Sequence, residues 1–260
     1  MPETDLFLLQ NAVRAAGKIA VELFGKAAHW DKPEGAGPVT EADLAVDKML
    51  RAELTAARPS YGWLSEESHD DGARLEHDCV FIVDPIDGTR NFVEGGRTWA
   101  ISAAAAQSGV ITAGVVFLPM RDMLFSAARG EGAMFNGGKI AVTSQTALSA
   151  AHVLATRSAM RSAPWKGQAP GATLAYRPSL AYRLGLVAQG RFDAMLTFRA
   201  TWEWDIAAGA LIVEEAGGIV SDAAGGPLRF NNAHPAVNGL IAACPGVHRD
   251  TMTALRVRTY

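Results

Sequence analysis

Cysteine is scarce in this sequence: among 260 residues only Cys79 and Cys244 occur, and they form no CxxC pair. So few and so widely separated thiols exclude a disulfide-stabilised scaffold, a zinc knuckle and a thioredoxin-type redox site. We expect both cysteines to be reduced and mostly buried, because a free cysteine behaves as a small apolar residue. The chemistry of the protein must therefore rest on other side chains.

Long apolar runs and basic blocks are also missing. The most apolar windows, at residues 100–106 and 110–118, are too short to span a bilayer. The first five residues lack the basic and apolar pattern of a signal peptide. The 24 basic residues, set against 27 acidic ones, form no stripe of the kind that binds nucleic acid. We therefore expect a cytoplasmic protein without a membrane or nucleic-acid partner, although a bound metal could still attract a small anion.

Apolar residues make up 49% of the chain and recur in two kinds of pattern. Helical spacing predicts helices at residues 6–24, 41–58, 180–189 and 205–215 and near the C-terminus. Short apolar runs predict strands at residues 61–64, 79–83, 100–106, 110–118, 123–127, 133–135, 152–156, 192–197 and 239–243. Residues 29–38, rich in proline, glycine and charge, predict an exposed loop. The arrangement indicates a layered α+β / α/β fold, one compact unit with halves at 1–140 and 141–260.

Two aspartates follow the strand predicted at residues 79–83. Asp84 and Asp87 flank a proline and an isoleucine, and Gly88 and Thr89 then open a turn whose backbone N–H groups could face an anion. Two carboxylates this close repel each other, so a hard divalent cation such as Mg²⁺ would stabilise the pair. The same residues would also suit a plain tight turn, because aspartate, proline and glycine all favour turns.

Two further acidic positions favour the metal site over the turn. Glu66 and Glu67 follow the short strand predicted at residues 61–64, so this pair is expected at a strand end. Asp205 lies beside two tryptophans at the start of a predicted helix, where its carboxylate would be partly removed from water. A carboxylate in such a place favours a cationic partner. The sequence therefore predicts a metal site built from acidic residues that lie far apart in the chain.

The acidic positions belong to four motifs that together resemble the inositol monophosphatase superfamily. In chain order these are Thr40-Glu41-Ala42-Asp43, Ser65-Glu66-Glu67, Asp84-Pro85-Ile86-Asp87-Gly88-Thr89 and Trp204-Asp205-Ile206-Ala207-Ala208-Gly209. The resemblance implies a layered αβαβα sandwich of the inositol monophosphatase and fructose-1,6-bisphosphatase type. It also implies a magnesium-dependent phosphomonoesterase that hydrolyses a small phosphorylated metabolite, forms a homodimer and is inhibited by lithium.

The same resemblance implies a role for each matched residue. The implied ligands of two to three Mg²⁺ ions are Glu66, Asp84, the backbone carbonyl of Ile86, Asp87 and Asp205. The implied phosphate-binding residues are Asp87, Gly88 and Thr89. Asp43 and Thr89 match the pair that deprotonates the attacking water, and Glu66 would hold a water on the third, weaker ion. Glu67 matches a carboxylate that lies directly behind the metal ligands in that family.

The choice of phosphate ester depends on weaker features. Glu203, two residues before Asp205, is similar to the 3′(2′),5′-bisphosphate nucleotidase branch. Phe198 stands where the inositol-specific enzymes carry a glutamate, and Arg199 beside it could face a second phosphate. Lys32 loosely matches a lysine of the family. We therefore expect Lys32, Arg199 and Glu203 to contact the substrate, and we favour 3′-phosphoadenosine 5′-phosphate.

Other functions stay open at this point. Inositol 1-phosphate is the main alternative substrate and histidinol phosphate a less favoured one, because Asn91-Phe92 after the aspartate motif is common in those branches too. A non-enzymatic alternative is a regulator that binds transcription complexes, as some members of the family do. The complete set of metal ligands favours the enzyme.

Overall fold

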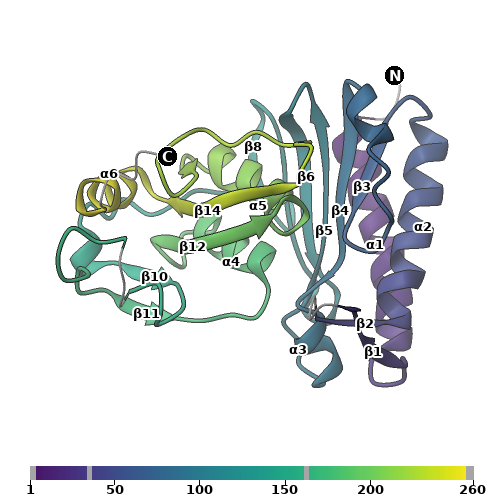
Figure 1. The fold of residues 1–260 in the computed structure, drawn as a ribbon, viewed down its shortest axis with the longest axis horizontal. Coiled ribbons are helices and arrows are strands. Elements are labelled where there is room, and N and C mark those ends of the chain that lie inside the picture. The colour runs from purple at the N-terminus through teal and green to yellow at the C-terminus, as the bar shows by residue number, and fades with distance from the viewer. Residues whose placement is uncertain (1–3, 34–36, 161–163, 256–260) are drawn as a thin grey trace.

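The computed structural model describes residues 4–33, 37–160 and 164–255, and its elements stack in five layers (Figure 1). Helices α1 (Asp5–Leu23) and α2 (Glu41–Ala57) cover the outer face of a seven-stranded sheet. Helices α4 (Leu180–Ala188) and α5 (Glu203–Glu215) lie between that sheet and a five-stranded one, and α6 (Pro245–Ala254) lies beyond the second sheet. This order confirms the predicted αβαβα sandwich.

The larger sheet contains every strand predicted between residues 61 and 135. Its order is β3 (Gly62–Ser65), β4 (Cys79–Asp87), β5 (Ala100–Gln107), β6 (Val110–Leu118), β7 (Met123–Ala128), β8 (Gly132–Phe135) and β9 (Gly138–Ile140). β3 runs parallel to β4, and the other neighbours are antiparallel. The expected end of β4 at Val83 is wrong, because the strand continues through the aspartate motif. Its register with β5 shifts between Asp84 and Asp87, an irregularity that accommodates a proline in a paired strand.

The smaller sheet carries the strands from the second part of the chain. Its order is β11 (Thr173–Ala175), β10 (His152–Leu154), β12 (Ala194–Trp202), β14 (Ala236–Ala243) and β13 (Ile219–Ser221). β12 extends five residues beyond the predicted end at 197, because it pairs with β14 as far as Trp202. All strands of this sheet lie after residue 141 and all strands of the larger sheet before it. The division into halves at 1–140 and 141–260 stays a prediction.

Residues 29–38 are not simply a loop. Strands β1 (His29–Asp31) and β2 (Pro38–Thr40) pair as an antiparallel ribbon, while positions 34–36 lie outside the described residues. Helix α3 (Thr89–Val93) follows the aspartate motif. Single 3₁₀ turns occur at Ala73–Glu76, Pro119–Arg121 and Leu148–Ala150. The ribbon matters for the site because Lys32, which lies between its two strands, forms ion pairs with Glu66 and Glu67.

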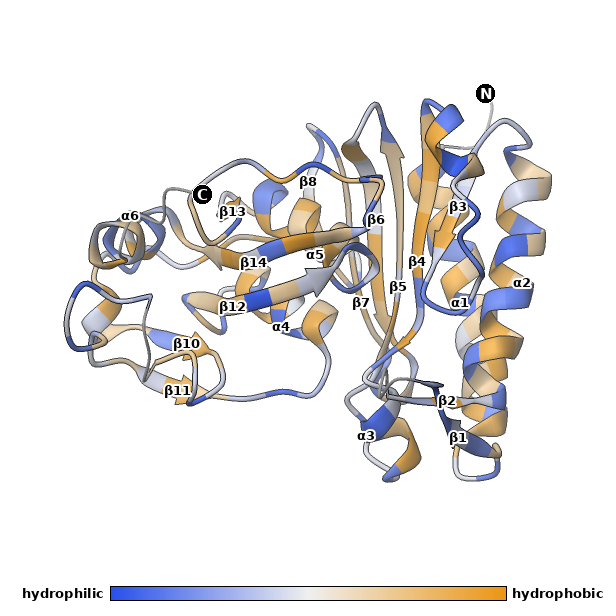
Figure 2. Cartoon of the chain, in the orientation of Figure 1, coloured by the Kyte–Doolittle hydropathy of each residue, from blue (hydrophilic) through white to orange (hydrophobic). Residues whose placement is uncertain are grey.

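Helix α5 packs tightly against the larger sheet, and this contact sets the distance between the two halves of the site. A Cβ atom added to Gly114 of β6 would lie 2.9 Å from the Ala208 backbone, so only glycine allows so close an approach. Figure 2 shows mostly apolar strands in the larger sheet, whereas hydrophilic segments interrupt α1 and α2. Among the described residues, no helix is long and apolar enough to cross a membrane. Both cysteines are free, with Cys244 buried and Cys79 half-buried.

Candidate active site

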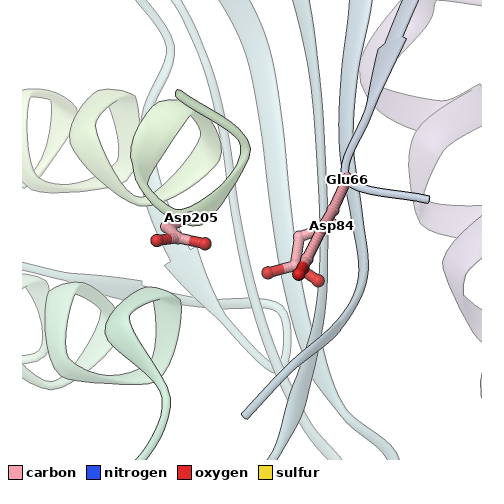
Figure 3. A group of neighbouring side chains, drawn as sticks. All are labelled: Glu66, Asp84 and Asp205. Carbon is pink, nitrogen blue, oxygen red and sulfur yellow. The ribbon is translucent and has the colours of Figure 1, made fainter. Parts of the chain in front are cut away.

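Three carboxylates from different elements meet between the larger sheet and α5. The parallel register of β3 and β4 sets Ser65 opposite Val83, so Glu66, directly after β3, is a neighbour of Asp84 within β4. Asp205 projects from the first turn of α5 toward them (Figure 3). One carboxylate oxygen from each of Glu66, Asp84 and Asp205 lies within 4.8 Å of the other two. The structure thus brings together three of the predicted metal ligands.

Asp84 is the most unusual member of this cluster. Its side chain is 1% exposed, and no hydrogen-bond donor of the described residues reaches either carboxylate oxygen. Burial and then the carboxylate of Glu66 raise the pKa of Asp84 well above its ordinary value. A buried charge without a partner costs several kcal/mol, so this position calls for a proton or a cation. An all-oxygen donor set fits a hard divalent ion such as Mg²⁺.

The remaining predicted ligands, Asp87 and Ile86, lie next to this cluster. Asp87 lines the same cavity, but its Oδ2 accepts hydrogen bonds from Ser179 Oγ and the Ala181 backbone N–H, each at 2.6 Å. Burial raises the pKa of Asp87 to about 6, against the lowering effect of these bonds. The Ile86 carbonyl accepts a hydrogen bond from Thr89 Oγ1 at 3.0 Å. Their roles as metal ligands stay predictions.

Asp43 and Thr89 form the predicted pair. Thr40 caps α2, and Asp43 closes the capping box by accepting hydrogen bonds from the Thr40 backbone N–H at 2.9 Å and its Oγ1 at 2.6 Å. Both bonds use Oδ2, which leaves Oδ1 facing Thr89 Oγ1 at 3.2 Å. Burial raises the pKa of Asp43 to about 6. The cap therefore fixes the orientation of a carboxylate whose second oxygen faces the Thr89 hydroxyl.

Lys32 lies on the acidic side of the site rather than open to a ligand. Its Nζ forms ion pairs with Glu66 Oε1 at 2.9 Å and Glu67 Oε1 at 2.7 Å. Burial raises the pKa of Glu67 to about 7 although Lys32 opposes the shift. The predicted contact of Lys32 with the substrate stays a prediction. In the structure, this lysine is paired with Glu66 and Glu67.

Asp47 is a residue that the sequence interpretation missed. It lies one turn after Asp43 on α2 and accepts hydrogen bonds from Ser65 Oγ at 2.5 Å and Ser68 Oγ at 2.7 Å. These two serines flank Glu66 and Glu67, so one carboxylate fixes both ends of the acidic turn. The sequence did offer a signal for Asp47. It lies four residues after Asp43 in a predicted helix, and positions i and i+4 share a helix face.

The predicted contact between Glu203 and the substrate is wrong. Glu203 is fully buried and is not among the described residues that line the cavity. Its carboxylate accepts hydrogen bonds from the backbone N–H groups of Asn231 at 2.6 Å and Asn232 at 3.0 Å. Residues two apart on a helix point to nearly opposite sides, so Glu203 faces away from Asp205 and anchors the segment before β14.

The acidic cluster opens into a cavity of about 300 Å³. Arg199 lines it, and its contact with the substrate stays a prediction. The sequence interpretation missed several other lining residues, among them Tyr176, Arg183, Trp202 and Trp204. Arg183 had a detectable signal, since an arginine is out of place within a helix that is otherwise apolar and buried.

The crowded carboxylates predict a pH-dependent stability for the metal-free protein. Asp43, Asp87 and Glu67 all have a pKa raised to between about 6 and 7 by burial, against about 4 in an unfolded chain. The folded state then binds more protons than the unfolded state, so stability falls as pH rises from about 4.5 to about 7.5. Thermal unfolding in EDTA at several pH values across this range measures the fall in stability.

Saturating Mg²⁺ provides the control for that titration. A bound cation favours the charged carboxylates, so the loss of stability between pH 4.5 and 7.5 is expected to shrink or reverse. A metal-free protein that gains stability over the same range would contradict the expectation.

Comparisons with known proteins place this site in a family. The family model of the inositol monophosphatase family matches residues 1–258. The chain is 36% identical to an inositol-1-monophosphatase of Rhizobium meliloti, with 85% of this chain and 86% of that protein covered. It is 34% identical to the Nus factor SuhB of Pseudomonas aeruginosa, with 84% and 86% covered.

A solved structure agrees with these sequence relatives. The IMPase of Thermotoga maritima superposes with a TM-score of 0.80 at 28% identity, covering 94% of this chain and 93% of that one. The five-layer fold and the order of the acidic motifs are thus accounted for by common descent. The chain is a phosphatase, a phosphoric monoester hydrolase, and it belongs to the inositol monophosphatase family.

Proposed function

We propose that the protein is a Mg²⁺-dependent phosphomonoesterase that acts on an inositol monophosphate or a similarly small polyol phosphate. The observation that carries the proposal is the buried carboxylate of Asp84, which no donor of the described residues reaches. Oxygen atoms of Glu66 and Asp205 lie within 4.8 Å of it. A divalent cation at this point would remove the mutual repulsion of the three carboxylates.

The acidic residues would hold the ions, and the turn after them would hold the phosphate. Glu66, Asp84 and Asp205 supply carboxylate oxygens, with Asp87 and the Ile86 carbonyl completing two to three Mg²⁺ sites. When bound, such ions lower the pKa of a water and offset the charge of a phosphate. Gly88 and Thr89 line the cavity beside the cluster. The φ of +98° at Gly88 suits glycine and exposes the backbone of this turn.

Thr89 would direct the attacking water. Its Oγ1 lies 3.2 Å from Asp43 Oδ1 and 3.0 Å from the Ile86 carbonyl, yet a hydroxyl carries one hydrogen and donates to only one of them at a time. When it donates to Asp43, a lone pair of Oγ1 accepts a hydrogen bond from the water. The water oxygen would bond to phosphorus, the bond to the alcohol oxygen would break, and one proton of the water would pass through Thr89 to Asp43. The leaving alkoxide would take a proton from solvent water, and Asp43 would then return its proton to the solvent.

The polyol phosphate is preferred to the bisphosphate nucleotide for two reasons. Several relatives that the chain matches over most of their length carry the names inositol-1-monophosphatase and inositol monophosphatase 2. The human relative of the latter name is 35% identical to the chain. Glu203, which favoured the nucleotidase, lies away from the cavity and contacts Asn231 and Asn232 instead.

A regulatory function is the second candidate. The observation that favours it is the similarity to the Nus factor SuhB of Pseudomonas aeruginosa. Such a function would use the surface of the protein, and nothing in it requires an unpartnered buried carboxylate. The acidic cluster therefore supports the enzyme, whether or not a regulatory function accompanies it.

Phosphate release from several esters at equal concentration tests the proposal. We expect turnover of myo-inositol 1-phosphate that requires Mg²⁺, disappears with EDTA and falls in millimolar lithium. Adenosine 3′,5′-bisphosphate and histidinol phosphate are the comparison substrates. If none of the three esters is turned over in a Mg²⁺-dependent way, the enzymatic proposal is wrong. Unchanged rates in lithium would refute the predicted inhibition. Homodimer formation, which sedimentation velocity measures, stays a prediction.

A further inference from the structure

A buried arginine outside the cavity joins two segments that lie far apart in the chain. Arg74 belongs to the 3₁₀ turn at Ala73–Glu76, and its side chain is only 1% exposed. Its guanidinium donates hydrogen bonds to the Asp70 carboxylate from Nε at 3.1 Å and from Nη2 at 2.9 Å. It also donates to the side-chain oxygen of Asn231 and, at 2.8 Å, to the Asn232 carbonyl. The planar set of donors therefore fixes both segments relative to each other.

The two asparagines continue this network to helix α5. Glu203, the first residue of α5, accepts hydrogen bonds from the backbone N–H groups of Asn231 at 2.6 Å and Asn232 at 3.0 Å. The side-chain amide of Asn232 donates to the same carboxylate at 2.6 Å. Asn231 thus meets Glu203 with its backbone and Arg74 with its side chain. A buried guanidinium and a buried carboxylate are joined through one short turn.

Both ends of the network lie next to carboxylates of the acidic cluster. Arg74 packs against the start of β3, because a Cβ atom added to Gly62 would lie 3.1 Å from the Arg74 Cα. Glu66 directly follows β3, and Asp205 lies two residues after Glu203 on α5. Glu66 and Asp205 thus come from different layers, yet their oxygens lie within 4.8 Å of each other. Because like charges at this distance repel, the elements that carry them must be held together.

We propose that Arg74 is a positioning residue for the metal site, and that it sets the separation of Glu66 from Asp205. The inference rests on the proposed function, since it concerns carboxylates that would hold Mg²⁺. Arg74 is not among the described residues that line the cavity, so it acts through the two asparagines and Glu203 rather than by touching the ion. Loss of a group that orients metal ligands typically lowers metal affinity by about 10–100-fold.

Three variants remove the link to different extents. Asn231→Gly disturbs the fold least, because Asn231 has a φ of +60°, a conformation that glycine adopts freely. It keeps the backbone N–H that donates to Glu203 and loses the side chain that meets Arg74. Arg74→Gln removes the whole guanidinium. Arg74→Lys keeps the charge without the planar set of donors.

Two competing explanations predict different results. The first is that the network only fastens the segment before β14, so its loss lowers stability and leaves Mg²⁺ affinity unchanged. Arg58→Gln is the matched control for lost stability, because Arg58 pairs with Asp5 at 2.9 Å at the opposite end of α2 from Asp43. The second is that the charge of Arg74 repels the ions, in which case its removal tightens Mg²⁺ binding.

Calorimetric titration with Mg²⁺, together with thermal unfolding in EDTA, tests the proposal. We expect the Kd for Mg²⁺ to rise about tenfold in Arg74→Gln and about threefold in Asn231→Gly. Arg74→Lys is expected to recover part of the affinity. Arg58→Gln is expected to lower Tm and to keep the Kd within about twofold of the wild type.

Three results would overturn the inference. They are an unchanged Kd in Asn231→Gly, a lower Kd in Arg74→Gln, and an equal rise of Kd in Arg58→Gln. If Arg74→Gln does not fold, Asn231→Gly alone decides. A wild type that neither binds Mg²⁺ nor releases phosphate refutes the proposed function instead. Crystal structures of the metal-free wild type and Asn231→Gly then decide the inference, which requires the carboxylates of Glu66 and Asp205 to move apart.

Discussion

Replacing Asp84 with asparagine is expected to abolish turnover and, at the same time, to stabilise the metal-free protein. In the wild type, Asp84 is buried within the cluster that includes Glu66 and Asp205, and no donor of the described residues reaches it. An amide of the same shape carries no charge, so the repulsion disappears with little change in packing. The amide is also a poor ligand for the ions that offset the charge of the phosphate.

The two effects are measured separately. A loss of several kcal/mol of transition-state stabilisation corresponds to a fall in kcat of about 1000-fold or more. A gain of about 1 kcal/mol in EDTA corresponds to a rise in Tm of about 2–4 °C for a chain of this size. Phosphate release measures the fall in kcat, and thermal unfolding in EDTA measures the rise in Tm. Added Mg²⁺ is expected to raise the Tm of the wild type, because the ion binds the folded state. This rise is expected to vanish in Asp84→Asn, since the carboxylate that would bind the ion is gone.

Asp193→Asn is the matched control for this variant. Asp193 is also buried, but its two oxygens accept hydrogen bonds from Thr143 Oγ1 at 2.5 Å and the His152 backbone N–H at 2.7 Å. Its replacement is expected to lower Tm and to leave the response to Mg²⁺ intact. If Asp84→Asn lowers Tm in EDTA, or keeps more than about a tenth of the wild-type kcat, the assignment of Asp84 to the metal is wrong.

Replacing Thr89 with alanine is expected to lower kcat by about 100-fold or more, with a much smaller change in KM. The Thr89 hydroxyl lies 3.2 Å from Asp43 Oδ1 and 3.0 Å from the Ile86 carbonyl. Alanine leaves the backbone of the phosphate turn in place, so binding of the substrate is largely kept. The loss therefore falls on the step in which the water gives up its proton.

Thr89→Ser separates the hydroxyl from the methyl group. Serine keeps Oγ and is expected to retain most of the activity, although its side chain rotates more freely than that of threonine. Steady-state kinetics of both variants at saturating Mg²⁺ provide the measurement. If the serine variant is as impaired as the alanine variant, the methyl contact rather than the proton transfer explains the loss.

The acidic half of the site was predictable from the sequence because its residues lie next to strand ends and helix starts. Asp43 is part of a capping box, Glu66 directly follows β3, and Asp84 lies in β4, which pairs with β3 in register. Local patterns therefore fix their positions. Glu203 was misplaced because its role was taken from a motif similar to the bisphosphate nucleotidase branch, whereas residues two apart on a helix point to nearly opposite sides.

The place of Arg183 and Trp202 in the cavity lining could not be predicted in the same way. Arg183 reaches the cavity only because α4 packs between the two sheets, and Trp202 lines it because β12 extends five residues further than its apolar run. Both facts depend on contacts between distant segments. The strand through Pro85 was missed for the same reason, because the shifted pairing with β5 decides it rather than local propensity.

The late position of Asp205 in the chain has a consequence for synthesis. Glu66 and Asp84 belong to a sheet whose strands are complete by Ile140, whereas Asp205 arrives with α5, after most of the protein has been made. The first sheet can therefore form on the ribosome without the full set of opposing charges. The repulsion is imposed only when α5 docks, so magnesium in the cell is expected to be needed for the last step of maturation rather than for the first.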